Sequence, residues 1–168
     1  MPISTITSAS TSGVISSGTA VASTSGTSID FTGLPSWVKR ITVMFNGVST
    51  NGTSGFLIQV GAGSVETSGY VSGTSNVANG AVGTLVTSTA GFVALSVTAA
   101  AATNSGIVTL ATLGSNIWVA GGSTYYSGSS TFVVAGNKTT SGTLDRVRIT
   151  TVNGTDTFDA GSINILYE

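Results

Sequence analysis

The stretch that decides the fold is S-G-T-L-D-R-V-R-I-T-T-V-N-G-T-D-T-F-D-A-G-S-I-N-I-L-Y-E, residues 141–168. From 144 to 152 apolar and polar side chains alternate, as a half-buried strand requires. A turn signal follows at Asn153-Gly154, and after a polar loop the alternate residues from Ile163 to Tyr167 are apolar again. The end of the chain is therefore predicted to be a strand, a turn-rich loop and a closing strand.

Short alternating segments of the same kind recur through the rest of the chain. After the segment 41–45, Asn46-Gly47 and Asn51-Gly52 are predicted to bracket a turn. The alanine-rich segment 97–104 is too short for a stable helix and is predicted to be a strand end that runs into a loop. Later strands are predicted at 107–113, 116–120, 125–126 and 131–135. Many short strands separated by Gly-rich turns predict an all-β, antiparallel, jelly-roll-like β-sandwich, with a closed barrel as the alternative.

The chain divides into a short arm and one domain. Residues 1–27 form an arm rich in Ser, Thr, Gly and Ala with sparse apolar positions, and residues 28–168 form the sandwich domain. A segment of this composition does not fold alone. We expect the arm to serve assembly or attachment by pairing with a neighbouring subunit or by lying against the sandwich. An ordinary edge strand within the same chain is the alternative.

The composition excludes several classes of function. The 168 residues include no cysteine and no histidine, which excludes disulfides, the usual zinc and iron-sulfur sites and histidine-dependent nucleophiles. Only 7% of the residues are charged, five basic against six acidic. An ordinary domain carries about a quarter. We therefore predict neither nucleic-acid binding nor a cofactor nor a catalytic function.

The low charge also bears on assembly. Because a net charge of -1 leaves little repulsion between copies, the chain tolerates close packing against itself, and an oligomer is predicted. No apolar run is long enough to span a bilayer, so no membrane insertion is predicted.

The six carboxylates are the remaining candidates for chemistry: Asp30, Glu66, Asp145, Asp156, Asp159 and Glu168. A glycosidase needs two of them facing each other across a cleft. Neighbouring basic residues favour structural ion pairs instead, so no catalytic residue is predicted. Asn153, Asp156 and Asp159 could offer oxygen ligands to calcium, but their spacing does not match an EF-hand loop. Asx-turn capping is the favoured interpretation, and no metal site is predicted.

The aromatic residues supply the candidate contact surface. Trp118, Tyr125 and Tyr126 lie in N-I-W-V-A-G-G-S-T-Y-Y-S-G-S-S, where flat rings alternate with small residues. Sugar rings stack on such side chains, and protein partners use them as anchors. The alternative is that Trp118 and one tyrosine belong to the core. Trp37, just after Leu34-Pro35, is predicted to be a core or corner residue.

Three segments of the chain resemble the distal domain of tail fibre proteins of tailed bacteriophages and prophages. They are residues 26–50, with G-T-S-I-D-F-T-G-L-P-S-W-V-K-R-I-T-V-M-F-N; 58–70, with I-Q-V-G and E-T-S-G-Y; and 143–168. The resemblance covers both ends of the domain and leaves the middle, from about 71 to 140, more variable. It implies a non-enzymatic virion protein that is trimeric and faces the host envelope.

The function expected from this resemblance is attachment. A homotrimer on the tail, in contact with other phage virion proteins, would bind a host surface glycan or protein. Several copies of the protein on one particle would together convert individually weak contacts into avidity. Because only a short tract precedes the domain, the alternative is a capsid decoration (cement) protein on the outer surface of the phage head.

Overall fold

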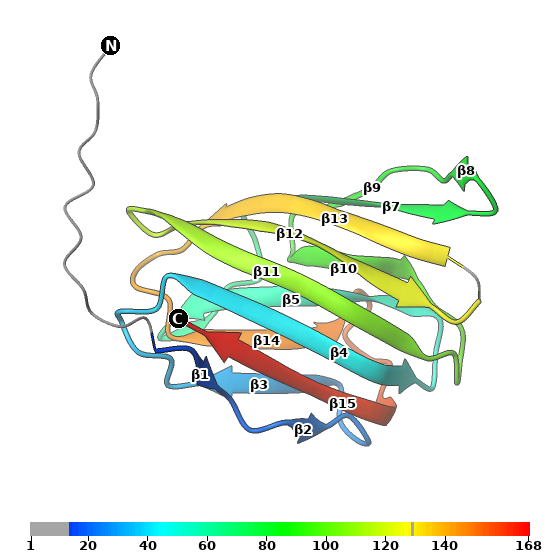
Figure 1. Cartoon of the computed structure of the whole chain (residues 1–168), viewed down its shortest axis with the longest axis horizontal. Coiled ribbons are helices and arrows are strands. Elements are labelled where there is room, and N and C mark those ends of the chain that lie inside the picture. The colour runs from blue at the N-terminus through cyan, green and yellow to red at the C-terminus, as the bar shows by residue number, and fades with distance from the viewer. Residues whose placement is uncertain (1–13, 129) are drawn as a thin grey trace, which may run out of the picture.

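The computed structural model describes residues 14–128 and 130–168, and these form two antiparallel β-sheets packed face to face (Figure 1). The strands of the large sheet are β1 (Ser16–Ser17), β2 (Val21–Ala22), β4 (Arg40–Thr50), β7 (Tyr70–Ala78), β8 (Ala81–Val82), β9 (Val86–Ser88), β11 (Asn104–Gly114), β12 (Ile117–Tyr126), β13 (Ser130–Thr139) and β15 (Phe158–Tyr167). The strands of the small sheet are β3 (Ser28–Thr32), β5 (Ser54–Ala62), β6 (Ser64–Val65), β10 (Phe92–Val97) and β14 (Arg146–Thr151). No helix occurs in the described residues, so the predicted all-β sandwich is confirmed.

The strand orders show how the sheets are connected. The large sheet runs β1-β15-β4-β11-β12-β13-β7-β8, with β2 beside β15 and β9 beside β7. The small sheet runs β10-β5-β14-β3, with β6 beside β5. The consecutive strands β11, β12 and β13 are neighbours in one sheet, which is a meander. The finer expectation of a jelly-roll connectivity is not confirmed.

The two strands predicted at the end of the chain belong to different sheets. β14 lies between β5 and β3 in the small sheet, whereas β15 lies between β1 and β4 in the large one. The predicted alternation holds in both, because Val147 and Ile149 of β14 and Ile163 and Ile165 of β15 are buried. The final stretch therefore contributes one strand to each layer of the sandwich.

The core lies between the inner faces of the two sheets. Phe45 of β4 stacks on Phe56 of β5 with ring centroids 6.3 Å apart, and Phe56 also contacts Phe158 of β15 at 5.6 Å. At the other side of the sandwich the ring of Tyr70 meets Phe92 edge to face at 5.1 Å. Such aromatic pairs stabilise the contact beyond simple area burial. Aromatic pairs thus join the sheets at two places.

The turn predicted between Asn46-Gly47 and Asn51-Gly52 begins later than expected, because β4 continues through Asn46-Gly47 as far as Thr50. Gly47 has a φ of 62°, and the register with β11 and with β15 shifts at this point. A glycine with positive φ is typical of a β-bulge, which bends a strand without ending it. The turn itself lies at Asn51-Gly52, as predicted.

The separate strands predicted at 116–120 and 125–126 are one continuous strand, β12. Gly121 and Gly122 do not interrupt it. A Cβ on Gly122 would lie 2.2 Å from the carbonyl oxygen of Ile107 on the neighbouring strand β11. Glycine is therefore required here for close approach of two backbones and not for a turn.

The described part of the predicted arm pairs within the chain. Ser16 and Ser17 pair with the end of β15, and Val21 and Ala22 pair with its middle. Residues 16–22 thus follow the edge-strand alternative. Residues 1–13 lie outside the described residues.

Candidate functional site

The three predicted contact residues do not form one cluster. Trp118, near the start of β12, is 4% exposed and belongs to the core. Tyr125, near its end, is 51% exposed, and Tyr126 is half-buried against the core. Seven positions along a strand separate Trp118 from Tyr125 by roughly 23 Å. Tyr125 and Tyr126 are consecutive residues of one strand and therefore face opposite sides of the sheet. Trp118 lies at the opposite end of the sandwich.

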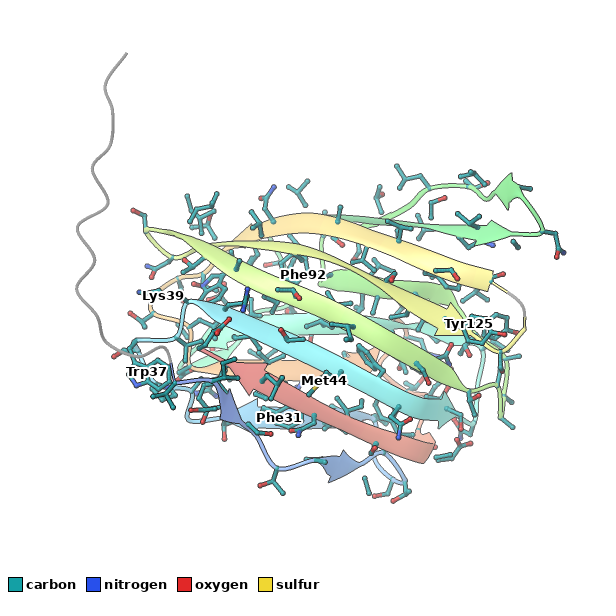
Figure 2. The ribbon with its side chains drawn as sticks, viewed as in Figure 1. Phe31, Trp37, Lys39, Met44, Phe92 and Tyr125 are labelled. Atoms are coloured by element: carbon teal, nitrogen blue, oxygen red, sulfur yellow. The ribbon has the colours of Figure 1, made fainter. Side chains whose placement is uncertain are left out.

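Trp37 is the exposed aromatic residue at the Trp118 end of the sandwich. It is 49% exposed, and its ring centroid lies 6.0 Å from that of Tyr167. Trp37 is a corner residue, in agreement with one of the two predicted roles, and it is not part of the core. Figure 2 shows Trp37 and Lys39 at one end of the molecule and Tyr125 at the other.

The loop 33–39 holds Trp37 outward through the residues on either side of it. Leu34 and Val38 are buried in the core, and the Leu34 N–H donates to the carbonyl oxygen of Asp145 at 2.9 Å. The Val38 N–H donates to the carbonyl oxygen of Pro35 at 3.1 Å, which closes a tight turn around Trp37. Two buried anchors and one turn therefore position the exposed ring.

An open pocket of about 120 Å³ lies beside this loop. Buried Trp118, Val38 and Leu144 contribute its apolar lining. Hydroxyl, amide and ammonium groups contribute the rest, from Ser36, Lys39, Thr112, Ser115, Asn116 and Thr143. A pocket of this size with convergent polar groups suits part of one small polar ligand, such as a sugar ring.

Lys39 gives this end of the sandwich an available positive charge. Within the described residues, the other four basic side chains form ion pairs: Arg40 with Glu168, Lys138 with Glu66, Arg146 with Asp145, and Arg148 with Asp30. Lys39 is exposed and forms none among those residues. The pocket therefore combines polar groups with a cation, which suits an acidic carbohydrate. Exposed Trp37 lies on the same loop, between the lining residues Ser36 and Val38, but does not itself line the pocket.

Most carboxylates have the structural roles expected from the sequence. Asp30 accepts two hydrogen bonds from the guanidinium of Arg148 across the β3–β14 pair, at 2.6 and 2.7 Å. Arg146 binds Asp145 in the same bidentate way, and this bond holds the pKa of Asp145 below its ordinary range. The lowered pKa keeps Asp145 charged, which does not suit a general acid.

The Asn153 loop has the contacts of an Asx turn. The side-chain oxygen of Asn153 accepts the N–H groups of Thr155 and Asp156 at 3.0 and 3.1 Å. The Asp156 carboxylate accepts the Asn153 amide and the Ser54 N–H, which lowers its pKa, and Asp159 accepts the hydroxyl of Ser49. Protein donors thus occupy these oxygens, and residues 14–128 and 130–168 contain no group of three or more acidic side chains placed to hold a metal ion.

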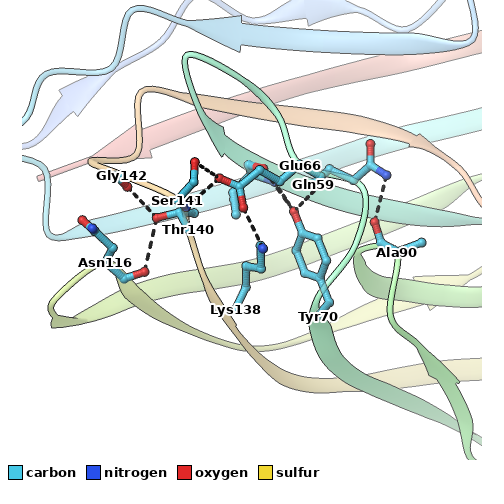
Figure 3. A network of polar contacts seen from close by, with 10 residues as sticks. Gln59, Glu66, Tyr70, Ala90, Asn116, Lys138, Thr140, Ser141 and Gly142 are labelled. Carbon is cyan, nitrogen blue, oxygen red and sulfur yellow. Dashed lines mark hydrogen bonds and ion pairs between the residues drawn. The ribbon is translucent and has the colours of Figure 1, made fainter.

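A polar cluster centred on Glu66 joins the two sheets (Figure 3). One carboxylate oxygen of Glu66 binds the Lys138 ammonium at 2.6 Å, and the other accepts the N–H and hydroxyl of Ser141, both at 2.8 Å. The Tyr70 hydroxyl accepts the Val60 N–H at 2.7 Å and donates to the Glu66 carbonyl at 2.9 Å. The Lys138 ammonium also lies 5.3 Å from the Tyr70 ring centroid.

The pKa values of this cluster follow from burial and hydrogen bonding. Burial raises the pKa of Glu66, but the hydrogen bonds from Lys138 and Ser141 and the charge of Lys138 together lower it more, so the net value lies below 4.5. Burial also raises the pKa of Tyr70 well above 10.0. Glu66 is therefore charged and Tyr70 neutral near pH 7, which fits a clamp between sheets and not a proton-transfer site.

No protein family, curated protein or solved structure matches this chain. In the part of the chain that the structure describes, no helix has the length and apolar character needed to cross a bilayer.

Sequence reasoning missed the pocket and Lys39. The signal was present in G-L-P-S-W-V-K, residues 33–39, where a proline turn places a tryptophan between two apolar anchors and a lysine directly after the second.

Proposed function

We propose that this protein is a structural protein of a tailed-bacteriophage virion, a tail fibre or receptor-binding subunit that attaches the particle to the host cell surface. The observation that carries the proposal is the end of the sandwich where exposed Lys39 lines a polar pocket and exposed Trp37 lies on the same loop. The ligand class is a surface glycan with acidic sugars. The resemblance of residues 26–50, 58–70 and 143–168 to distal fibre domains supplies the virion context.

The binding mode follows from the chemistry of these groups. The Trp37 ring offers an apolar face to the C–H groups of a sugar, and the Lys39 ammonium attracts a carboxylate on the same or the next residue. The pocket side chains, among them Asn116 and Thr143, supply hydrogen bonds to sugar hydroxyls. One such site binds weakly, so a homotrimer that carries several copies provides the avidity that attachment needs.

The test is binding of the purified protein to immobilised bacterial lipopolysaccharides and capsular polysaccharides. Trp37→Ala and Lys39→Ala should each weaken binding at least about tenfold, which corresponds to about 1.4 kcal/mol. Tyr125→Ala is the matched control, because Tyr125 is 51% exposed against 49% for Trp37 and lies at the other end of the molecule. Equal losses in the Trp37 and Tyr125 variants, or no glycan binding by the unmodified protein, would overturn the proposed site.

The second candidate function is capsid decoration, and a specific feature favours it. The outer face of the large sheet carries almost no charge and is open over several strands, as a protein that packs tightly on a shell requires. Electron microscopy of particles labelled through this subunit separates the two. Label at the tail tip supports attachment, and a layer of label over the head supports decoration.

A further inference from the structure

The outer face of the large sheet is unusually poor in charge. β7, β11 and β12 contain no charged residue, and the one charged residue of β13, Lys138, is buried on the inner side. In Figure 1 the large sheet faces the viewer, and no other described element crosses in front of β11, β12 and β13. On a monomer, the strands of an open sheet ordinarily carry polar and charged side chains at every second position, and these keep the outer face solvated.

Side chains on this face form rows that run across the strands. One row contains Ile107 and Val133, which are both half-exposed, with Ser123 between them. The adjacent row consists of small side chains, namely Thr109, Gly121, Ala135 and Gly73. A Cβ on Gly121 would meet nothing within 4 Å, whereas one on Gly73 would lie 3.1 Å from the Leu85 side chain, so the row is open at its centre and closed by Leu85 at the β7 end. The face therefore has an apolar ridge beside a shallow groove.

The size of the face matches that of a stable protein interface. The four neighbouring strands without outward charge, β11, β12, β13 and β7, give a width of roughly 19 Å at about 4.8 Å per strand. The length of β12 is roughly 33 Å at about 3.3 Å per residue. The product, roughly 630 Å² before side-chain relief is added, approaches the roughly 800 Å² per partner of a standard interface.

We propose that a second copy of this chain covers the outer face of the large sheet. A two-fold contact brings the same surface of both copies together, so a charge near the axis lies close to its own copy in the partner. A surface without charge avoids this repulsion, and a net charge of -1 adds little repulsion between whole chains. A second flat sheet fits the face at the spacing of about 10 Å at which sheets stack, with Ile107 and Val133 of one copy over the small-residue row of the other.

This inference rests on the self-assembly part of the proposed function and is independent of glycan binding. The test is sedimentation equilibrium of the unmodified protein and of Val133→Glu and Ile107→Glu, measured separately. Each glutamate places a charge in the contact on every copy and should weaken association at least roughly a hundredfold. The matched control is Val152→Glu, because Val152 and Val133 are both 55% exposed, and Val152 lies in the turn after β14.

The outcomes separate the interface from assembly itself. Dissociation of the Val133 and Ile107 variants, with a folded circular dichroism spectrum and an intact Val152 control, supports the interface. An oligomer that persists in both variants overturns this face while leaving self-assembly standing. A single-chain mass for the unmodified protein overturns both. An equal effect of Val152→Glu would also count against the face, because the charge would then act regardless of position.

Discussion

The two faces of the large sheet differ although the same strands build both. On the inner face of β13, Phe132 and Val134 are almost fully buried against the small sheet, whereas Val133, between them in sequence, is half-exposed. The charged groups also differ, since Lys138 is paired and buried on the inner side and the outer side of this strand has none. The inner face thus holds the chain together, and the outer face is available to hold copies together.

The largest expected effect comes from the core. Phe132→Ala should lower the free energy of unfolding by about 3 to 5 kcal/mol, because the side chain is buried and the cavity left behind collapses only in part. Val133→Ala, one residue along the strand, should change it by less than about 1 kcal/mol. Urea unfolding at concentrations below association measures both. Similar losses in the two variants would remove the contrast between the faces.

The next effect comes from the clamp between the sheets. Glu66→Gln leaves the Lys138 ammonium buried without its anionic partner and should cost about 2 to 3 kcal/mol of stability. Asp30→Asn breaks the more exposed pair with Arg148 and should cost less than about 1 kcal/mol. The same unfolding experiment compares them, and a larger loss in Asp30→Asn would contradict the structural role given to Glu66.

A third contrast uses two adjacent glycines of β12. Gly122→Ala forces a Cβ against the Ile107 carbonyl oxygen and should destabilise the chain by about 1 to 3 kcal/mol. The Cβ added by Gly121→Ala points into open space, and the backbone at Gly121 does not have a positive φ. This substitution should leave the free energy of unfolding unchanged or raise it by up to about 1 kcal/mol. Thermal unfolding distinguishes the pair, and equal midpoints would mean that the close approach of β11 and β12 is not as described.

The smallest effect is a dependence on pH. Because the pKa of Glu66 is lower in the folded state than its ordinary 4.5, its contribution to stability is present above pH 4.5 and is lost as the pH falls through the folded value. The difference in stability between the unmodified protein and Glu66→Gln should therefore shrink below pH 4.5. A difference that stays constant well below pH 4.5 would show that the folded and unfolded pKa values of Glu66 are equal.

Alternation of side chains predicts the strands well where a strand has one buried face. The segments that became β14 and β15 show this, because Val147, Ile149, Ile163 and Ile165 are each more buried than their neighbours in sequence. The same signal does not tell which sheet a strand joins, since that depends on pairing between distant residues. It also does not separate a bulge from a turn, as Asn46-Gly47 shows, because both need a residue with positive φ.

The site was harder to predict than the fold. The two glycines of β12 are interpreted from the sequence as a break between two strands. Because Trp118 and Tyr125 lie an odd number of residues apart on one continuous strand, one faces inward and the other outward, and the predicted break hides this relation. Trp37 could be placed at a corner, but its exposure depends on the burial of Leu34 and Val38 on either side of it. The pocket near the Trp37 loop is lined by three segments that are distant in sequence, and no local sequence pattern shows that they come together.

The mass of the unmodified protein, measured by native mass spectrometry over a range of concentrations, tests the central claim most directly. An assembly subunit that covers its uncharged sheet face with a second copy should give at least twice the 16.6 kDa of one chain. A mass of 16.6 kDa at every concentration would contradict the account.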